Sequence, residues 1–272
     1  MTADDGYLLD NRQAEAGRRF DAMAELFNPT TFGHLRALGI APGWRVWEVG
    51  AGGASVPDWL AGQVGPSGRV LATDIDLSWL EPAAGRPPER PAYQALRHDV
   101  AADPPVAGPF DLVHARLVLV HVPDRARALA AMISVLRPGG WLLVEDADPA
   151  LQPLACPDEF GPDQRLANEL RRGFRQLLAE RGADLGYGRT LPRLLRTAGL
   201  TGVASDCYFP VGGRLCEQLE LATISQLRGR LIEAGLASEQ QIERHLATVA
   251  AGGLDLATAP LVSAWGRTPT EA

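Results

Sequence analysis

Lysine is absent from the 272-residue sequence, so all 26 residues counted as Lys or Arg are arginines. Chemistry that needs a lysine amine, such as a Schiff base or the lysine of a phosphate-binding loop, is therefore excluded from these residues. Cysteine is scarce as well: the three cysteines, Cys156, Cys207 and Cys216, show no metal-ligand spacing. We expect them to be reduced thiols that pack like small apolar residues, and we expect no metal site.

Long apolar runs and an excess of positive charge are also lacking. No apolar stretch approaches the roughly 20 residues that a membrane helix needs, and the acidic start lacks the features of a signal peptide. The formal net charge of −7 argues against a nucleic-acid partner, because binding a phosphate backbone needs a basic surface. We therefore expect a cytoplasmic protein with a small-molecule substrate and no membrane partner, and leave open whether it forms a homo-oligomer.

Short strand-like segments alternate with helical ones over the first part of the chain. Residues 10–38 read as helical, and the break at Pro29 predicts two helices there. Strands are then predicted at 45–49, 69–73, 93–97, 110–115 and 141–144, the last after a turn at Arg137-Pro138-Gly139-Gly140. Strands that alternate with helices indicate a parallel sheet wound by right-handed crossovers.

The second part of the chain is predicted to be mostly helical, with two further strands. Helices are expected at 162–181, 190–198, 215–231 and 238–250, and strands at 203–211 and 259–265. Three consecutive parts follow from this pattern: an N-terminal helical cap (1–40), a cofactor-binding core (41–150), and a segment that completes the sheet and carries inserted substrate-lid helices (151–272).

A glycine-rich turn, Gly50-Ala51-Gly52-Gly53, follows the first strand at the sheet edge where doubly wound proteins bind ligands. Dinucleotide sites use similar turns, but the last glycine of that fingerprint is replaced by Ser55. Glu48, two residues before the first glycine, would repel a pyrophosphate and suits the sulfonium and ammonium of S-adenosylmethionine. The alternative for Glu48 is that it caps the amides of the glycine loop. An oxidoreductase is disfavoured further, since a Tyr-x-x-x-Lys pair cannot exist without lysine.

Acidic residues follow the next strands in order. Asp74 ends the second strand and is predicted to accept hydrogen bonds from both ribose hydroxyls, with Ile75 packing on the adenine. Asp99 follows the third strand and is predicted to accept from the adenine amino group, while the Val100 amide reaches a ring nitrogen. One acid at a strand end is common, but acids at successive strand ends form a more specific pattern.

These segments resemble the ordered motifs of class I S-adenosylmethionine-dependent methyltransferases: Glu48-Val49-Gly50-Ala51-Gly52, Ala72-Thr73-Asp74-Ile75, His98-Asp99-Val100, Phe110-Asp111-Leu112-Val113 and Leu136-Arg137-Pro138-Gly139-Gly140. The resemblance is closest to the ubiquinone/menaquinone-type and natural-product tailoring branch. It implies an α/β fold with a doubly wound, Rossmann-like seven-stranded sheet, its last strand antiparallel. It also implies S-adenosylmethionine as cofactor and methyl transfer as the reaction. The extra helical segments, which would form a lid, fit a small, largely apolar acceptor better than a protein or a nucleic-acid strand. Ala54 departs from the pattern, since many members have a third glycine there.

Candidates for catalysis follow the fourth and fifth strands. The stretch that ends at His121 resembles the family segment in which a histidine approaches the substrate, although a core histidine bonded to a carbonyl is an equal alternative. Glu145 and Asp146 point to opposite faces, so one of them reaches the site; by similarity to sugar and small-molecule methyltransferases we assign Asp146. Arg116 is predicted to hold the methionine carboxylate or to pair with a nearby acid. The other histidines have no comparable context: His34, His98, His114 and His245.

The substrate pocket is expected to involve residues outside the compact core. Tyr7, Phe20, Glu145 and Phe174 are tentative lining residues, although core packing is the usual role of any single aromatic residue. Whether oxygen, nitrogen or carbon is methylated is left open by the sequence. A second function, a non-methylating protein of the same fold that shapes a substrate or regulates, also stays open, because alignment of reactants leaves no motif.

Overall fold

Two compact units make up the protein in a computed structural model that describes residue 8 and residues 14–80 and 92–270. The sheet unit consists of Pro29–Ala147, Tyr187–Cys207 and Leu261–Ala272. The helical unit consists of Met1–Asn28, Asp148–Gly186 and Tyr208–Pro260. Residues 29–40, which the sequence predicts within an N-terminal cap, group with the sheet unit because Leu35 and Leu38 are buried in its core.

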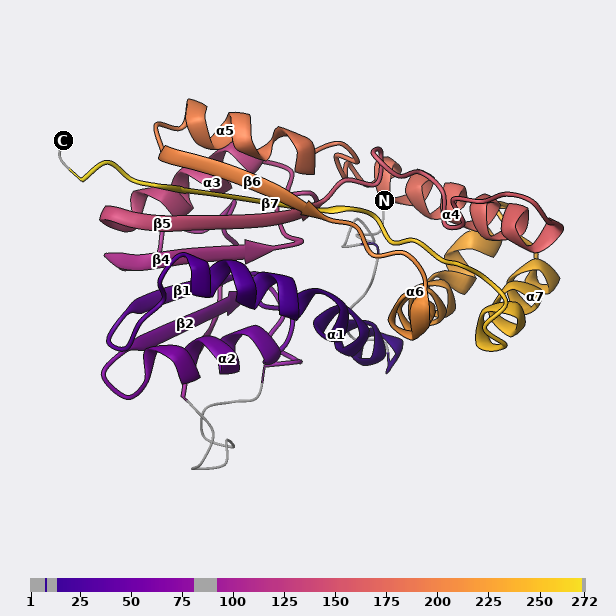
Figure 1. Cartoon of the computed structure of the whole chain (residues 1–272), viewed down its shortest axis with the longest axis horizontal. Coiled ribbons are helices and arrows are strands. Elements are labelled where there is room, and N and C mark those ends of the chain that lie inside the picture. The colour runs from indigo at the N-terminus through magenta and orange to yellow at the C-terminus, as the bar shows by residue number, and fades with distance from the viewer. Residues whose placement is uncertain (1–7, 9–13, 81–91, 271–272) are drawn as a thin grey trace. The chain divides into compact units, whose positions relative to one another are not determined.

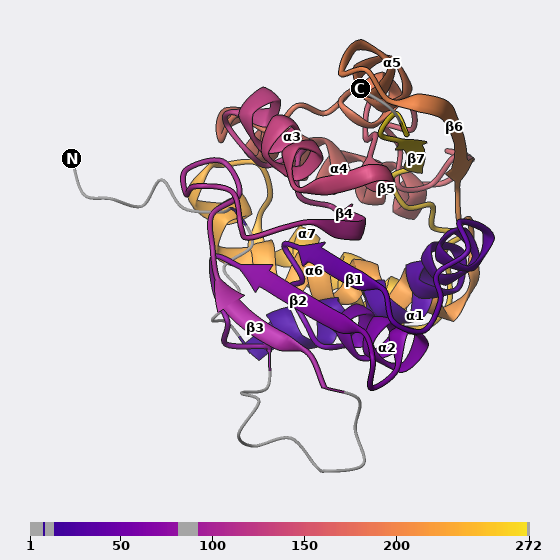
Figure 2. The same ribbon diagram turned by 90° about the vertical axis from the view of Figure 1, so that its left-hand side faces the viewer.

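The sheet unit is built on seven strands in the order β3-β2-β1-β4-β5-β7-β6 (Figures 1 and 2). Their bounds are β1 Arg45–Val49, β2 Arg69–Asp74, β3 Gln94–Arg97, β4 Phe110–Arg116, β5 Leu136–Ala147, β6 Thr201–Tyr208 and β7 Leu261–Arg267. The strands from β3 to β5 pair in parallel, and β7 runs antiparallel to β5. The predicted doubly wound sheet with an antiparallel last strand is thus confirmed.

Helices cover the two faces of this sheet with separate apolar cores. One core packs α2 (Ser55–Val64) and the end of α1 (Ala14–Ala37) against residues such as Val46, Leu112 and Leu143. The other packs α3 (Arg125–Ser134) and α5 (Leu191–Thr197) against Val113 and Val144. Leu112 and Val113 are successive residues of β4, so the two cores reflect the alternation of side chains across a strand.

Two local predictions are wrong. The sequence predicts two helices separated at Pro29, but α1 is a single helix with Pro29 inside it. Proline removes one hydrogen bond from a helix interior, and buried residues before and after it, Leu26 and Leu35, hold the helix together. The predicted turn at residues 137–140 lies within β5: Phe110 pairs with Leu136 and Leu112 with Trp141, so the extra residues form a bulge.

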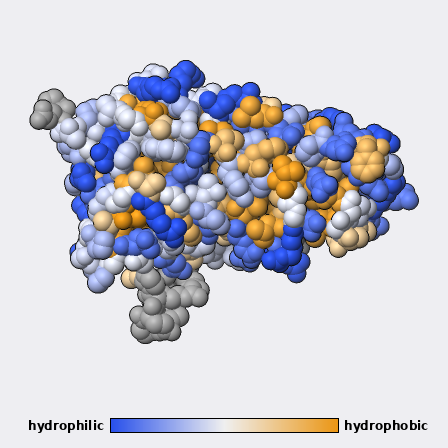
Figure 3. All heavy atoms as spheres, in the orientation of Figure 1, coloured by the Kyte–Doolittle hydropathy of each residue, from blue (hydrophilic) through white to orange (hydrophobic). Residues whose placement is uncertain are grey.

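The helical unit contains α4 (Pro162–Glu180), α6 (Gly213–Glu233) and α7 (Glu239–Ala250) around a leucine- and isoleucine-rich core. No helix in the described part of the chain has the length and apolar character to cross a membrane. Several large apolar side chains of this unit are exposed: Leu151, Phe160, Phe209, Val211 and Ile232. In Figure 3 hydrophobic surface is frequent over this unit. The unit also has a cavity of about 270 Å³ lined by residues that include Leu26, Tyr208, Pro210 and Leu215.

Gly188 provides a test of the packing at the end of β5. A Cβ at this position would lie 2.8 Å from the Asp146 carbonyl oxygen and 3.1 Å from that of Ala147. Gly188→Ala should therefore destabilise the protein by roughly 1–3 kcal/mol, as overpacking does. Gly229 is the control, because it lies inside α6 with open space around it. Gly229→Ala should stabilise by about 0.5–1 kcal/mol. Melting temperatures that move in the same direction for both variants would contradict this account.

Candidate active site

At two positions the glycine turn after β1 adopts a backbone conformation that favours glycine. Gly50 and Gly52 both have a φ of 61°, in the left-handed region. A Cβ on Gly50 would lie 2.4 Å from Cγ2 of Val118, in the segment after β4. Ala54 has an ordinary helical φ of −78°, so the replacement of the family's third glycine costs the backbone nothing. The loop sits at the carboxyl ends of β1 and β4, as predicted.

Asp74 caps this loop from the end of β2. Its carboxylate accepts hydrogen bonds from the Gly52 amide at 2.8 Å and from the Asp76 amide at 3.0 Å. Burial raises the pKa of Asp74, although these amides act in the opposite direction. Capping of the loop amides is the alternative predicted for Glu48, but the acid that accepts from the Gly52 amide is Asp74.

The other predicted cofactor residues lie at the adjacent strand ends. The Ile75 side chain is 54% exposed, which leaves an apolar surface next to Asp74. One oxygen of Asp99 accepts from the amides of Ala101 and Ala102 at 2.9 and 3.2 Å, so Asp99 also shapes its own turn. The Val100 side chain is buried in the core; the role predicted for its backbone amide stays a prediction.

Polar side chains from four adjacent strands share one face of the sheet. Glu48 of β1 pairs with His114 of β4, and Arg116 of β4 pairs with Glu145 of β5. Glu145 in turn pairs with Ser263 of β7. Residues opposite one another in neighbouring strands point to the same side, as do residues two apart in one strand. The register therefore brings these side chains together under the end of α1.

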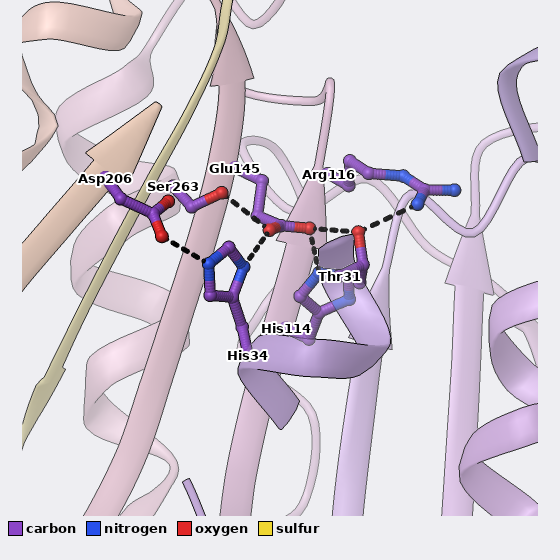
Figure 4. A network of polar contacts seen from close by, with 7 residues as sticks. All are labelled: Thr31, His34, His114, Arg116, Glu145, Asp206 and Ser263. Atoms are coloured by element: carbon purple, nitrogen blue, oxygen red, sulfur yellow. Dashed lines mark hydrogen bonds and ion pairs between the residues drawn. The ribbon is translucent and has the colours of Figure 1, made fainter. Parts of the chain in front are cut away.

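Glu145 is the centre of the resulting network (Figure 4). One of its oxygens accepts from Thr31 Oγ1 at 2.5 Å and contacts His114 Nε2 at 3.3 Å. The other accepts from Ser263 Oγ at 2.7 Å and contacts His34 Nδ1 at 3.0 Å. Glu145 is fully buried. The sequence predicts Glu145 as a tentative lining residue, and the structure instead places it in this buried network.

The carboxylates of Glu48 and Glu145 stabilise the protonated form of the buried His114. Burial by itself would lower the pKa of His114, but Glu48, 2.6 Å from its Nδ1, and Glu145 raise it to about 9. His114 is therefore an imidazolium at neutral pH. Burial likewise would raise the pKa of Glu145, but hydrogen bonds from His114 and His34 and the charge of Arg116 hold it well below its usual range.

Arg116 joins this network through a hydroxyl group. Its guanidinium donates to Thr31 Oγ1 at 2.9 Å, and Thr31 donates to Glu145. Burial lowers the pKa of Arg116, while the charges of Glu145 and Glu48 raise it. Arg116 is predicted from the sequence to bind the methionine carboxylate or to pair with a neighbouring acid. The structure shows an indirect link to an acid, Glu145, through Thr31. The role of Arg116 in cofactor binding stays a prediction.

Asp146 lies on the opposite face of β5 from Glu145, in an environment with fewer partners. One of its oxygens accepts from the Val120 amide at 3.3 Å, and the other has no hydrogen-bond partner among residues 14–80 and 92–270. Burial raises the pKa of Asp146 to about 8, so the carboxyl group is protonated at neutral pH. A buried carboxyl oxygen without a partner is uncommon in proteins and marks a candidate functional group.

His121 lies in the turn that follows β4. The turn begins at Leu117, whose φ of 58° is unusual for a bulky residue. The His121 amide donates to the Val118 carbonyl at 3.0 Å, and the residue is partly exposed. Strained backbone at the carboxyl end of a strand is typical of functional turns, and the catalytic role of His121 stays a prediction.

The predicted aromatic lining residues belong to the helical unit or lie outside the described residues. Phe174 packs against the core of the helical unit, and the Arg19 guanidinium lies 4.9 Å from the ring centre of Phe20. Tyr7 is not among the described residues. Sequence reasoning assigned no role to His34 and His114, which the structure brings to Glu145. A signal for His114 was present, since it and Arg116 occupy alternate positions of one strand.

Comparisons with known proteins agree with this arrangement. A family model described as a methyltransferase domain matches residues 47–142. Methyltransferase str2 of Strobilurus tenacellus is 31% identical over 232 residues, which cover 82% of this chain and 78% of that protein. The ubiquinone/menaquinone biosynthesis C-methyltransferase UbiE of Ectopseudomonas mendocina is 31% identical over 48% of this chain, and this chain covers 56% of that protein.

A solved structure gives the same fold. Haemonchus contortus phosphoethanolamine N-methyltransferase 2, in complex with phosphomonomethylethanolamine and S-adenosylhomocysteine, has a TM-score of 0.60 at 14% identity. The similarity covers 98% of this chain and 61% of that one. With the sheet order and the glycine turn, these findings define a Rossmann-like methyltransferase. The chain belongs to the class I S-adenosylmethionine-dependent methyltransferases.

The residues at the carboxyl edge of the sheet fit this cofactor. The turn around Gly50 lets the backbone approach a ligand, Asp74 offers carboxylate oxygens, and the exposed Ile75 offers an apolar surface for a base. The Glu48 carboxylate is buried and contacts His114 at 2.6 Å, and the role predicted for it toward the cofactor stays a prediction. S-adenosylmethionine, when bound, supplies a methyl group activated by its sulfonium.

Asp74→Ala tests the ribose contact. The change should weaken binding of S-adenosylhomocysteine at least about tenfold, since charge-assisted hydrogen bonds contribute roughly 1.5–3 kcal/mol each. Asp111→Ala is the matched control, because Asp111 also accepts from a backbone amide, that of Arg45 at 2.7 Å, but at the amino end of β4. Calorimetry should show that Asp111→Ala binds S-adenosylhomocysteine with the affinity of wild type. Wild type should not bind NAD. Equal affinities for wild type and Asp74→Ala would show that Asp74 acts only as a cap.

Proposed function

We propose that this protein transfers a methyl group from S-adenosylmethionine to a small, largely apolar organic acceptor, such as a quinone-like compound or a secondary metabolite. The observation that carries the acceptor class is the helical unit, in which large apolar side chains are exposed and an open pocket is lined mostly by apolar residues. The net charge of −7 disfavours a nucleic-acid acceptor. The name of UbiE, a ubiquinone/menaquinone biosynthesis C-methyltransferase, is compatible with such an acceptor.

The cofactor is proposed to bind at the carboxyl ends of β1, β2 and β3. In this assignment Asp74 accepts from the ribose, Asp99 and the Val100 amide contact the adenine, and Ile75 packs on its face. The turn Gly50-Ala51-Gly52 passes under the methionine part, whose ammonium and carboxylate are bound by Glu48 and Arg116. The contact of Glu48 with His114 at 2.6 Å supports this assignment, because it fixes the carboxylate in one orientation.

Catalysis is proposed to depend on alignment, with Asp146 or His121 handling a proton where the acceptor has one to lose. Aligning two reactants can contribute roughly 7–11 kcal/mol. Asp146 supports this role because one buried carboxyl oxygen has no partner among the described residues. Its pKa of about 8 means that it orients a substrate as a hydrogen-bond donor below that pH and accepts a proton above it. His121 is the alternative proton acceptor.

A transfer assay tests the function directly. Purified protein is incubated with isotope-labelled methyl donor and a panel of hydroquinones, phenols and apolar amines, with an oligonucleotide and a peptide pool as controls. Label should appear in one class of small molecule, and mass spectrometry should identify the methylated atom. Label only in the oligonucleotide or peptides would contradict the proposal. Tight cofactor binding without labelled product from any panel member, or from extracts of the producing cell, would instead favour a non-methylating protein.

Two variants identify the group that handles the proton. If Asp146 is the base, wild-type turnover should rise with pH through about 8, and Asp146→Asn should remove this rise. Loss of the true base should lower turnover by roughly 10²–10⁴-fold, with cofactor affinity nearly unchanged. The same measurements on His121→Asn test the alternative. Near-normal turnover in both variants would show that the reaction proceeds by alignment without a base.

A stability measurement provides the control for Asp146. The pKa of about 8 in the folded protein lies above the ordinary value of 3.8, so the folded state holds one proton more than the unfolded state between these pH values. Wild-type stability should therefore contain a contribution that falls as pH rises through this window. Asp146→Asn lacks that contribution. As pH increases, its free energy of unfolding should therefore rise relative to that of wild type. A constant difference between the two proteins would show that Asp146 is ionised in the fold.

A further inference from the structure

An unbroken series of acidic and imidazole groups runs from the glycine-turn strand to the exposed side of β6. Glu48 contacts His114 at 2.6 Å, and His114 contacts Glu145 at 3.3 Å. His34 links Glu145, at 3.0 Å, to Asp206, at 2.8 Å. The outer part of this series is shown in Figure 4. The Asp206 side chain is 53% exposed and that of Glu145 is fully buried, so the series connects a buried cluster to solvent.

Stability alone is a weak reason for such a cluster. Bringing charged groups out of water costs several kcal/mol per ion, and apolar replacements of buried ion pairs are often neutral or stabilising. Here Glu48, His114 and Glu145 are buried on three adjacent strands, and Arg116 adds a further charge. Two members of this set, Glu48 and Arg116, are the residues proposed to hold the methionine part of the cofactor.

The charge of the inner cluster depends on one histidine. With His114 protonated and His34 neutral, the charges of Glu48, Glu145, His114 and Arg116 cancel. Protonation of His34 adds one positive charge next to Glu145, and Asp206 balances it only from the exposed side. Hydrogen bonding to Glu145 is the largest of the effects that raise the pKa of His34 above its usual 6.5, and Asp206 raises it further.

Within the described part of the chain, the ring of His34 contacts residues of three neighbouring strands. Glu145 of β5 and Asp206 of β6 contact its ring directly. His114 and Arg116 of β4, and Glu48 of β1, act through Glu145. From β7 the facing residues are Ser263, bonded to Glu145, and Trp265, 5.1 Å from the imidazole, and neither titrates.

We propose that His34 sets the preference of the site for the positively charged methyl donor over its neutral product, S-adenosylhomocysteine. The donor carries one positive charge more than the product, because the sulfonium becomes a thioether on transfer. A neutral His34 leaves the inner cluster without excess positive charge and favours the donor. A protonated His34 repels the donor more than the product. This inference rests on the proposed assignment of Glu48 and Arg116 to the cofactor.

Calorimetric titrations between pH 6 and 9 test the proposal with both ligands. For wild type, the ratio of the donor Kd to the product Kd should increase about three- to tenfold as pH falls. His34→Gln keeps a donor for Glu145 but cannot take up a proton, so its ratio should lack the increase that wild type shows as pH falls. Asp206→Asn removes one of the groups that raise the pKa of His34. Its Kd ratio should therefore increase by a similar factor, but with a midpoint at lower pH than in wild type. Using the ratio cancels titrations common to both ligands.

The outcomes separate this inference from the proposed function. If wild type binds neither ligand, the function fails and the inference falls with it. If both ligands bind and His34→Gln retains the pH dependence of wild type, the inference is overturned while the function stands. Should His34→Gln fail to fold, as judged by its thermal unfolding, Asp206→Asn decides. The proposal is overturned if the Kd ratio of Asp206→Asn changes with a midpoint at the same pH as in wild type or at a higher pH.

Discussion

The buried imidazolium of His114 between two carboxylates is the interaction on which the site depends. It links Glu48 of β1 to Glu145 of β5 across the central strand β4. Because Glu145 also binds Thr31 and His34, the same cluster attaches the end of α1 to the sheet. The strand that precedes the glycine turn and the strand that carries Asp146 are therefore held in one register by charge as well as by backbone hydrogen bonds.

The family core could be predicted from the sequence because its determinants are local. Alternating apolar segments define the strands, and Gly50 and Asp74 each lie at a strand end, where neighbouring residues are enough to suggest a role. The network around Glu145 could not be predicted in this way, since its partners are separated by between 31 and 118 residues along the chain. The alternation of His114 and Arg116 in one strand is a local signal, but no local pattern shows which partners strand register brings to them. The continuous α1 was missed for a similar reason, because tertiary burial on both sides overrides the local effect of Pro29.

The two carboxylates at the end of β5 show how one strand can serve two purposes. Glu145 and Asp146 are adjacent, yet the pKa of Glu145 is held low by cations and that of Asp146 is raised to about 8 by burial. Alternation across the strand places one acid among histidines and the other in an apolar core. The difference in protonation is therefore a direct result of strand geometry and requires no special feature of either residue.

The points at which the chain leaves and re-enters the sheet have an evolutionary consequence. Two of the segments that form the helical unit are inserted between Ala147 and Tyr187 and between Cys207 and Leu261. Both insertions are separate in sequence from the glycine turn and from the acids that follow β2 and β3. Mutations can therefore alter the inserted segments while the glycine turn and the strand-end acids are inherited unchanged. The same holds for exchange of a whole insert between homologous genes. Such an arrangement lets the helical unit change without rebuilding the sheet.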